Sequence, residues 1–339
     1  MTAAESAITG LDRTQEKASL ARIQASVKDR LDAVTEDMVT AVSHDAPLVA
    51  QMGTHLMAMR GKMFRPTLVL LCSSVEDTPE PFAITLAAAV ELIHLATLVH
   101  DDAVDHSVLR RGMPTLNSLF SHQISVIMGD FLYSTALTKL VSLGDLDALR
   151  ALTRASTEMT VGEMRQLAVQ DALSFTEDDY YRLIGSKTAS LISAACEIGS
   201  LAGARHHRQA LADYGSALGM AFQIADDLID YTEKESTTGK PTGLDLKEHK
   251  VTLPLIAAMR LMGSDDRRRV DQLFANSDPG DAEVRDVIQI VADNGGLDYA
   301  REKGAVFAEQ AKAALANVPG TVARTALIES ISYVMERHA

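Results

Sequence analysis

The amino-acid sequence predicts an all-α protein, and three observations support this. The 339 residues are 47% hydrophobic but only 4% aromatic, with 14 Met and no Trp, a mixture that favours helices over strands. Glycine and proline cluster at a few places instead of recurring every ten residues, as they would in a β-sandwich or barrel. Between those clusters apolar residues recur with helical spacing, as in Leu20, Ile23, Val27 and Leu31. We therefore expect a helix bundle.

Proline, glycine and polar clusters place the breaks between the expected helices. They fall near Pro47, at 61–66, 77–81 and 112–114, near Gly144 and Gly203, and at 236–243 and 277–280. Ser174 followed by Glu177 is an S-x-x-E pattern, which predicts a capping box at the start of a helix. We expect residues 1–12 to be loosely ordered. Because no low-complexity linker divides residues 13–339, we expect these to form a single domain.

Charge and composition argue against several classes of function. With 32 Lys and Arg against 46 Asp and Glu, the net charge is -14, which is unsuited to non-specific nucleic-acid binding. No signal-peptide pattern is visible at the N-terminus. The most apolar run, residues 81–100, contains Glu91 and His94, which a lipid-spanning helix tolerates poorly. We expect a buried helix there, no stable membrane insertion, a cytoplasmic protein, and buried reduced thiols at Cys72 and Cys196.

Two aspartate clusters share the pattern D-D-x-x-D. They are Asp101, Asp102 and Asp105 and, 125 residues later, Asp226, Asp227 and Asp230. Positions i and i+4 lie on one helix face, where like charges destabilise an isolated helix by about 0.2–0.5 kcal/mol per pair. Both clusters also follow strongly apolar sequence, so a divalent cation is the expected compensation. Carboxylates without cysteine or an i+4 histidine favour magnesium, which completes its shell with water and substrate phosphates.

A solvated acidic helix face would explain one such cluster. Two copies, each preceded by a buried type of helix, favour a metal site and a phosphorylated substrate. One bundle with two facing acidic helices fits the repeat better than two domains.

Basic and polar residues occur where phosphates would be held. One pair lies in a Gly-Lys turn that leads into a helix, whose free amides favour anions. An arginine pair follows the first cluster by five residues, although a salt-bridge network with the aspartates is an alternative. The loop after the second cluster is either a lid over a diphosphate or a flexible connection. These residues are Lys62, Arg65, Arg110, Arg111, Lys187, Thr188, Gln223, Lys240 and Lys250.

These motifs, in this order, resemble the trans-isoprenyl diphosphate synthase family, also called polyprenyl synthetases. Residues 94–112 (HLATLVHDDAVDHSVLRRG) and 222–230 (FQIADDLID) resemble its two aspartate-rich motifs. The matching segments also include GKMFRP, a turn at Gly129 to Leu132, Gly162-Glu163 with Gln166, Lys187-Thr188 and residues 239–255. The resemblance implies an antiparallel bundle of the isoprenoid synthase type around a central apolar cavity, and a homodimer. Met63 departs from the pattern, because many relatives carry a third basic residue there.

The resemblance implies two diphosphate pockets and a role for each residue. Isopentenyl diphosphate would be held by Lys62, Arg65, His94 and Arg111. The allylic diphosphate would be held by Arg110, Lys187, Thr188, Gln223, Lys240 and Lys250, together with three magnesium ions. Asp101, Asp105 and Asp226 would bind metal directly, and Asp102, Asp227 and Asp230 would assist, partly through water.

The expected reaction is a head-to-tail condensation that yields a trans-polyprenyl diphosphate. Metals and cations would stabilise the departing diphosphate, and the apolar interior would exclude water from the allylic cation. The double bond of isopentenyl diphosphate then attacks, and a proton is lost; no dedicated side-chain base is evident.

The helix that ends at Asp101 predicts the length of the product. Each helical turn climbs about 5.4 Å, close to one extended isoprene unit, so the tail is expected to run toward the helix N-terminus. Ala96 and Thr97 are small where aromatic residues stop growth in the resembled family, and Ile93 above them is no large plug. The first cluster also lacks an insertion found in many bacterial farnesyl-forming relatives. We expect a product longer than geranylgeranyl, although these small residues also fit close helix packing. Candidate plugs from another helix are Met128, Leu132 and Leu137.

Four alternatives remain to be weighed. A short-chain farnesyl or geranylgeranyl diphosphate synthase needs only a plug in the tunnel. A class I terpene cyclase needs neither a second aspartate cluster nor a second diphosphate pocket. A non-catalytic subunit of a heteromeric synthase is expected to have lost aspartates or basic residues, and here all are present. An acidic scaffold or calcium-binding protein predicts no ordered basic motifs, and no EF-hand loop occurs.

Overall fold

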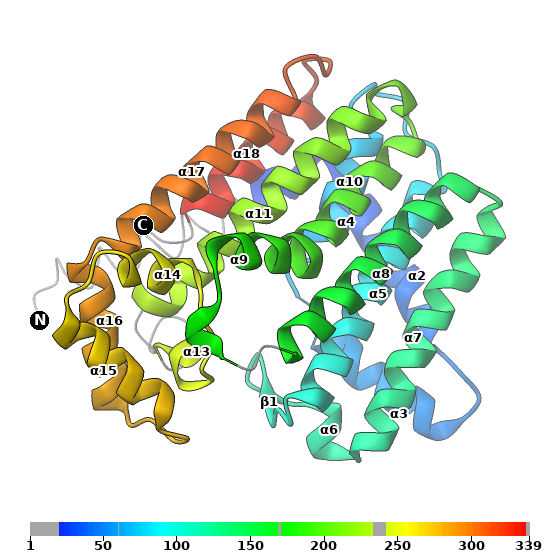
Figure 1. Cartoon of the computed structure of the whole chain (residues 1–339). Helices are drawn as coiled ribbons and strands as arrows, with labels where there is room; N and C mark the ends of the chain where they lie inside the picture. The colour runs from blue at the N-terminus through cyan, green and yellow to red at the C-terminus, as the bar shows by residue number, and fades with distance from the viewer. Residues whose placement is uncertain (1–19, 60, 169–170, 233–241, 337–339) are drawn as a thin grey trace, which may run out of the picture. The chain divides into compact units, whose positions relative to one another are not determined.

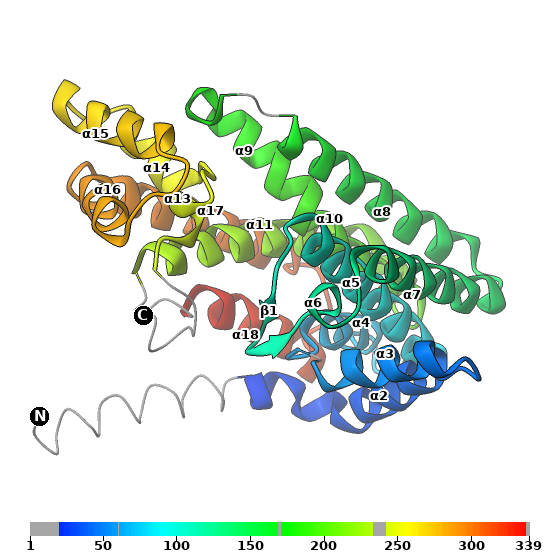
Figure 2. The same ribbon diagram turned by 90° about the horizontal axis from the view of Figure 1, so that it is seen from below.

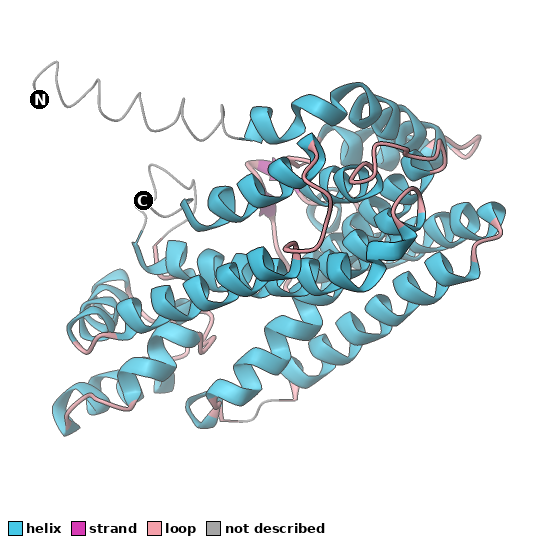
Figure 3. Cartoon of the chain, turned by 90° about the horizontal axis from the view of Figure 1, so that it is seen from above, coloured by secondary structure: helices cyan, strands magenta, loops and turns pink. Residues whose placement is uncertain are grey.

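The computed structural model of the chain describes residues 20–59, 61–168, 171–232 and 242–336. The expectations for residues 1–12 and for Lys240 therefore lie outside the described residues. The regular secondary structure of the described part is almost entirely helical (Figures 1 and 3). Two short strands pair antiparallel as a hairpin, β1 (Leu109–Arg110) and β2 (Met113–Pro114). The predicted all-α class is confirmed.

The chain divides into two compact units by the clustering of its contacts. The first unit takes its described residues from Met1–Ser156, Leu191–Gly215 and Ala314–Ser330, and the second from Thr157–Ser190, Ser216–Ala313 and Ile331–Ala339. Helices α8 (Leu146–Leu167) and α11 (Arg208–Thr232) contribute residues to both. That residues 13–339 form a single domain stays a prediction.

Helix α5 is the central element of the first unit, and it packs against α2, α4 and α7, as the views from two sides show for α7 (Figures 1 and 2). It is apolar on nearly all sides, which is the pattern of a buried helix. By length and composition α5 and α7 pass the test for a bilayer span, yet 67% of the most apolar window of α5 is buried within the chain. The helices of this unit are η1 (Ala25–Val27), α2 (Lys28–Val42), α3 (Pro47–Ala58), α4 (Phe64–Ser73), α5 (Ala83–Val104), α6 (Leu116–Leu119), α7 (His122–Leu143), α10 (Ser190–Leu201) and η4 (Arg205–His207).

The second unit gathers shorter helices around its own apolar core, to which Ile224, Leu228, Leu253 and Val284 belong. Its elements, some of which extend into the first unit, are η2 (Ala172–Ser174), α9 (Glu177–Ile184), the π-helical turn η3 (Gly185–Ala189), α13 (Leu244–Lys247), α14 (Leu253–Met259), α15 (Ser264–Ala275), α16 (Asp281–Asp293), α17 (Gly296–Ala314) and α18 (Val322–Glu336).

Several predicted breaks are confirmed. Pro47 opens α3, and Gly144 caps α7 in the left-handed conformation with φ of 69°. The predicted capping box is wrong by two residues. Thr176 caps α9 and exchanges hydrogen bonds with Asp179, whereas Ser174 closes the preceding 3₁₀ turn. Two overlapping S/T-x-x-D/E patterns occur there, and the sequence does not show which one the chain uses.

The predicted turn at Gly129 to Leu132 is also wrong, because these residues lie within α7. Gly129 instead permits a close crossing of α5 and α7: a Cβ atom there would lie 2.2 Å from Nε2 of His100. In this chain the segment therefore contributes to helix packing and does not form a turn.

Helix α10 approaches two neighbours at backbone distance. A Cβ atom at Gly199 would lie 2.5 Å from the carbonyl oxygen of Val69 on α4, and one at Gly215 of α11 would lie 2.8 Å from that of Ile192. Cys72 and Cys196 are buried beside these crossings as free thiols, as predicted.

Candidate active site

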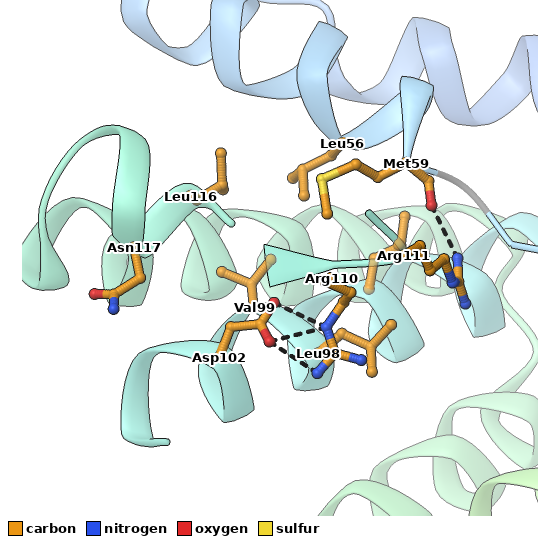
Figure 4. A pocket seen from close by; sticks show the side chains of 10 residues that line it. Leu56, Met59, Leu98, Val99, Asp102, Arg110, Arg111, Leu116 and Asn117 are labelled. Carbon is orange, nitrogen blue, oxygen red and sulfur yellow. Dashed lines mark hydrogen bonds and ion pairs between the residues drawn. The ribbon is translucent and has the colours of Figure 1, made fainter. Parts of the chain in front are cut away.

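The first aspartate cluster lies at the C-terminal end of α5. Asp101 and Asp102 are in its last turn, and Asp105 caps it. The negative end of a helix dipole disfavours carboxylates, so three of them there call for a cation. Asp102 is buried and already neutralised, because Nε of Arg110 bonds its two oxygens at 2.8 and 2.9 Å (Figure 4). Asp101 is half-buried and Asp105 exposed, so the two predicted direct metal ligands of this cluster are the accessible ones.

The β1–β2 hairpin places both arginines that follow this cluster. Arg110 forms an ion pair with Asp102, as the salt-bridge alternative expects, and its contact with a phosphate stays a prediction. Arg111 has a left-handed backbone, with φ of 52°, and its Nη1 donates to the carbonyl oxygen of Met59 at 2.9 Å. A non-glycine residue in this conformation stores strain, a frequent feature of functional sites.

A small pocket lies beside this ion pair and is otherwise mostly apolar (Figure 4). Leu56, Met59, Leu95, Leu98, Val99, Asp102, Arg110, Arg111, Leu116 and Asn117 line it. None of the predicted tunnel residues does so. Ile93, Ala96, Met128 and Leu132 are buried and Thr97 is half-buried. Their role in a tunnel stays a prediction.

Arg65, His94 and Arg111 are close enough for their charges to interact inside the first unit. Burial lowers the pKa of His94 well below its usual value, and the charges of Arg65 and Arg111 lower it further, so the imidazole is neutral. Burial also lowers the pKa of Arg65, and its Nε has no hydrogen-bond partner among the described residues. A half-buried arginine with a buried, unsatisfied donor suits an anion.

The turn that carries Lys62 into α4 is held by a residue from the N-terminal part of the chain. Met63 has φ of 54°, and Nε2 of Gln24 donates both to the carbonyl oxygen of Lys62, at 2.9 Å, and to the hydroxyl of Thr67, at 3.0 Å. Sequence analysis missed Gln24, whose partners are 38 and 43 residues away.

The second aspartate cluster lies near the C-terminal end of α11, where the helix dipole is again unfavourable. Asp226 is exposed, while Asp227 is buried and accepts hydrogen bonds from Tyr180, at 2.6 Å, and Gln223, at 2.8 Å. Thr188 donates to Gln223 at 2.7 Å, so the predicted residues Thr188, Gln223 and Asp227 form one chain. Burial and then the charge of Asp245 raise the pKa of Asp227 well above its usual value.

Asp230 of the second cluster binds the start of α13. Its carboxylate accepts hydrogen bonds from the backbone amides of Leu244, at 3.0 Å, and Asp245, at 3.1 Å. These hydrogen bonds place the carboxylate of Asp245 beside this cluster. Burial together with the charge of Asp230 raises the pKa of Asp245 to about 7. From the sequence, this segment was expected to contribute lysines only. Nζ of Lys250 pairs with Glu248 at 2.6 Å.

The π-helical turn between α9 and α10 presents Lys187. Its Nζ pairs with Glu163 at 2.6 Å and donates to Gln166 at 3.2 Å, both on α8. Gly162 allows this approach, because a Cβ atom there would lie 2.8 Å from Cβ of Ser186. Single π-helical turns occur frequently at functional sites. The sequence matched Glu163 and Gln166 to the family, and the structure shows that they hold the lysine.

The donor set fits a hard divalent cation that is shared with phosphate. Each cluster adds carboxylates to the negative end of a helix, where a cation would offset both charges. In the part of the chain that the structure describes, no three His, Cys, Asp or Glu side chains gather closely enough to hold an ion alone. An ion there would need water or substrate oxygens to complete its shell, as magnesium does.

Comparison with known proteins agrees with this geometry. A nonaprenyl diphosphate synthase (all-trans, geranyl-diphosphate specific) of Rhodobacter capsulatus is 37% identical over 93% of this chain and 97% of its own. An octaprenyl diphosphate synthase of Escherichia coli strain K12 is 35% identical over 94% of this chain and 99% of its own.

Two solved structures share the fold over most of their length. A decaprenyl diphosphate synthase from Rhodobacter capsulatus superposes with a TM-score of 0.89 at 36% identity, covering 94% of this chain and 99% of that one. A polyprenyl synthase from Caulobacter crescentus CB15, complexed with calcium and isoprenyl diphosphate, gives a TM-score of 0.89 at 34% identity, with 94% and 98% covered. Residues 46–291 match the polyprenyl synthetase family itself. The chain therefore belongs to the polyprenyl synthetase family of prenyltransferases.

Proposed function

We propose that the protein is a long-chain trans-polyprenyl diphosphate synthase, which condenses isopentenyl diphosphate head to tail with an allylic diphosphate. One observation carries the proposal: each of two D-D-x-x-D clusters lies at the negative end of a helix, and the half-buried Arg65, whose Nε has no partner among the described residues, lies in the same unit as the first. The relatives named for eight- and nine-unit products support a long chain.

The side chains divide the work between two anions. Lys62, Arg65 and Arg111 bind isopentenyl diphosphate, and the neutral imidazole of His94 can donate one N–H bond to it. Lys187 and Arg110 bind the allylic diphosphate, with Lys187 pre-oriented by Glu163. Asp101, Asp105 and Asp226 would hold magnesium, which would supply charge stabilisation for the leaving diphosphate. The apolar side chains of α5 exclude water from the allylic cation.

We further propose that three magnesium ions serve the site and that the enzyme is a cytoplasmic homodimer. Helix α7 supports the dimer, because its apolar window is only 33% buried and its exposed side chains include Ile127 and Val141. An exposed apolar helix face is typical of a protein interface. The free buried thiols Cys72 and Cys196 suit a reducing compartment.

The decisive experiment incubates the purified protein with magnesium, farnesyl diphosphate and labelled isopentenyl diphosphate, and resolves the products by chain length. We expect a ladder that ends well beyond twenty carbons. A stop at fifteen or twenty carbons, with geranyl and dimethylallyl primers also tested, would keep the enzyme and remove the open tunnel. No incorporation with any primer, with magnesium binding unchanged in Asp101→Ala and Asp226→Ala, would favour a non-catalytic subunit.

A further inference from the structure

A buried carboxylate, that of Glu91, interacts by charge with Arg65 and Arg111 and belongs to neither aspartate cluster. Glu91 of α5 is only 4% exposed, ten residues before Asp101. Its Oε2 has no hydrogen-bond partner among the described residues, and the same is true of Nε of Arg65. A buried carboxylate with an unsatisfied oxygen is costly, so a specific charge arrangement must retain it.

The arginines supply that arrangement. Burial lowers the pKa of both Arg65 and Arg111, and the charge of Glu91 opposes this in each, whereas the charge of Arg111 lowers the pKa of Arg65 further. The half-buried Arg65 and the exposed Arg111 therefore repel each other, and the buried carboxylate of Glu91 offsets that repulsion. Arg110 does not compete for this carboxylate, because its guanidinium is bound to Asp102. Burial raises the pKa of Glu91, and the charges of Arg65 and Arg111 oppose that rise; with the carboxylate ionised, the three side chains carry one net positive charge.

We propose that Glu91 is a positioning residue for the isopentenyl diphosphate pocket, holding the guanidinium of Arg65 in place by charge so that its unsatisfied Nε remains available to the substrate diphosphate. The proposal rests on the function proposed above. Glu91 touches no reacting atom in this scheme and acts through Arg65. An aliphatic or amide side chain of the same size would fill the space and leave the two arginines to repel each other.

The test replaces Glu91 by glutamine, which keeps the shape and removes the charge. We expect the KM for isopentenyl diphosphate to rise about tenfold, as for loss of one charge-assisted interaction, with kcat and the KM for the allylic substrate within about twofold. Calorimetric binding of isopentenyl diphosphate in EDTA should weaken by the same factor. Glu91→Asp keeps the charge and should restore part of the affinity.

A matched control and a double variant separate positioning from packing. Asp37 in the same unit also has a buried oxygen without a partner, and its other oxygen bonds Nζ of Lys139 at 2.7 Å. Asp37→Asn should change thermal stability without changing either KM. In an Arg65→Gln background, Glu91→Gln should cause no further loss of affinity if it acts through that arginine.

The outcomes distinguish this inference from the proposed function. If the unchanged protein binds no isopentenyl diphosphate, the proposed function fails first. If it binds and Glu91→Gln binds equally well or more tightly, the carboxylate does not position the pocket. A loss that remains in the Arg65→Gln background, or equal changes in both KM values, also overturns the inference.

Discussion

At the scale of single residues, Asp245, beside the second cluster, has a carboxyl group that ionises near neutral pH. The pKa of Asp245 is raised to about 7, above the unfolded value of about 3.9, so the folded state binds its proton more tightly. The stability from this proton is complete at low pH and is lost as pH rises through about 7. We expect the metal-free protein to melt at a lower temperature at pH 8 than at pH 6.

Asp245→Asn should flatten that dependence. It should not abolish it, because the pKa of Asp227 is raised too. Thermal melts in EDTA across this pH range check the prediction, and an unchanged slope in the variant contradicts it.

The hydroxyl of Tyr180 provides a second test at this scale. Tyr180→Phe leaves one oxygen of the buried Asp227 with one donor fewer, so we expect a loss of about 1–3 kcal/mol in the free energy of unfolding. The magnesium concentration for half-maximal activity should also rise. Tyr181→Phe is the matched control, because the Tyr181 hydroxyl donates to Glu177, at 2.8 Å, and not to an aspartate of the cluster. Denaturant unfolding and a magnesium titration would show equal effects in both variants if the prediction is wrong.

The sequence predicted the residues that carry charge in motifs, and it missed those that support them. Asp101 and Asp226 could be proposed from the sequence because the spacing within each cluster is local. Tyr180 is 47 residues from Asp227, and Glu91 is 26 from Arg65, so only the folded chain brings each pair together. No pattern of one residue type at a fixed spacing marks such partners.

At the scale of elements, we expect the π-helical turn to position Lys187 for the allylic substrate, and Gly162 allows a test. Gly162→Ala places a methyl group 2.8 Å from Cβ of Ser186, so the turn must shift. We expect the KM for the allylic substrate to rise several-fold, with a loss of about 1–3 kcal/mol in unfolding free energy. Gly263→Ala is the control, since no atom lies within 4 Å of its added Cβ. Steady-state kinetics and chemical denaturation decide, and equal behaviour of the two variants would refute the claim.

Helix boundaries show where sequence patterns suffice. Proline fixes its own φ angle and glycine can adopt the left-handed conformation, so the breaks at Pro47 and Gly144 were predictable from the sequence. The π-helical turn at Gly185–Ala189 was not, because the same residues fit an α-helix and tertiary contacts from α8 decide between the two.

At the scale of the whole molecule, the exposed side of α7 predicts the oligomeric state. Ile127 is 65% exposed on a helix of high mean hydropathy, so Ile127→Glu should convert a dimer into monomers. Leu261 is 75% exposed outside the long helices, and Leu261→Glu should leave the dimer intact. Sedimentation velocity measures both. A monomeric unchanged protein, or an intact Ile127→Glu dimer, would contradict the prediction.

The close crossings of α10 have a consequence for how this sequence can diverge. Gly199 and Gly215 touch no residue assigned to substrate or metal, yet an added methyl group would collide with backbone oxygens at 2.5 and 2.8 Å. A backbone oxygen cannot rotate away as a side chain can. In a saturation library selected for activity, both positions should therefore tolerate glycine alone, as strictly as a catalytic residue. Invariance at these two sites would record helix spacing and carry no information about chemistry.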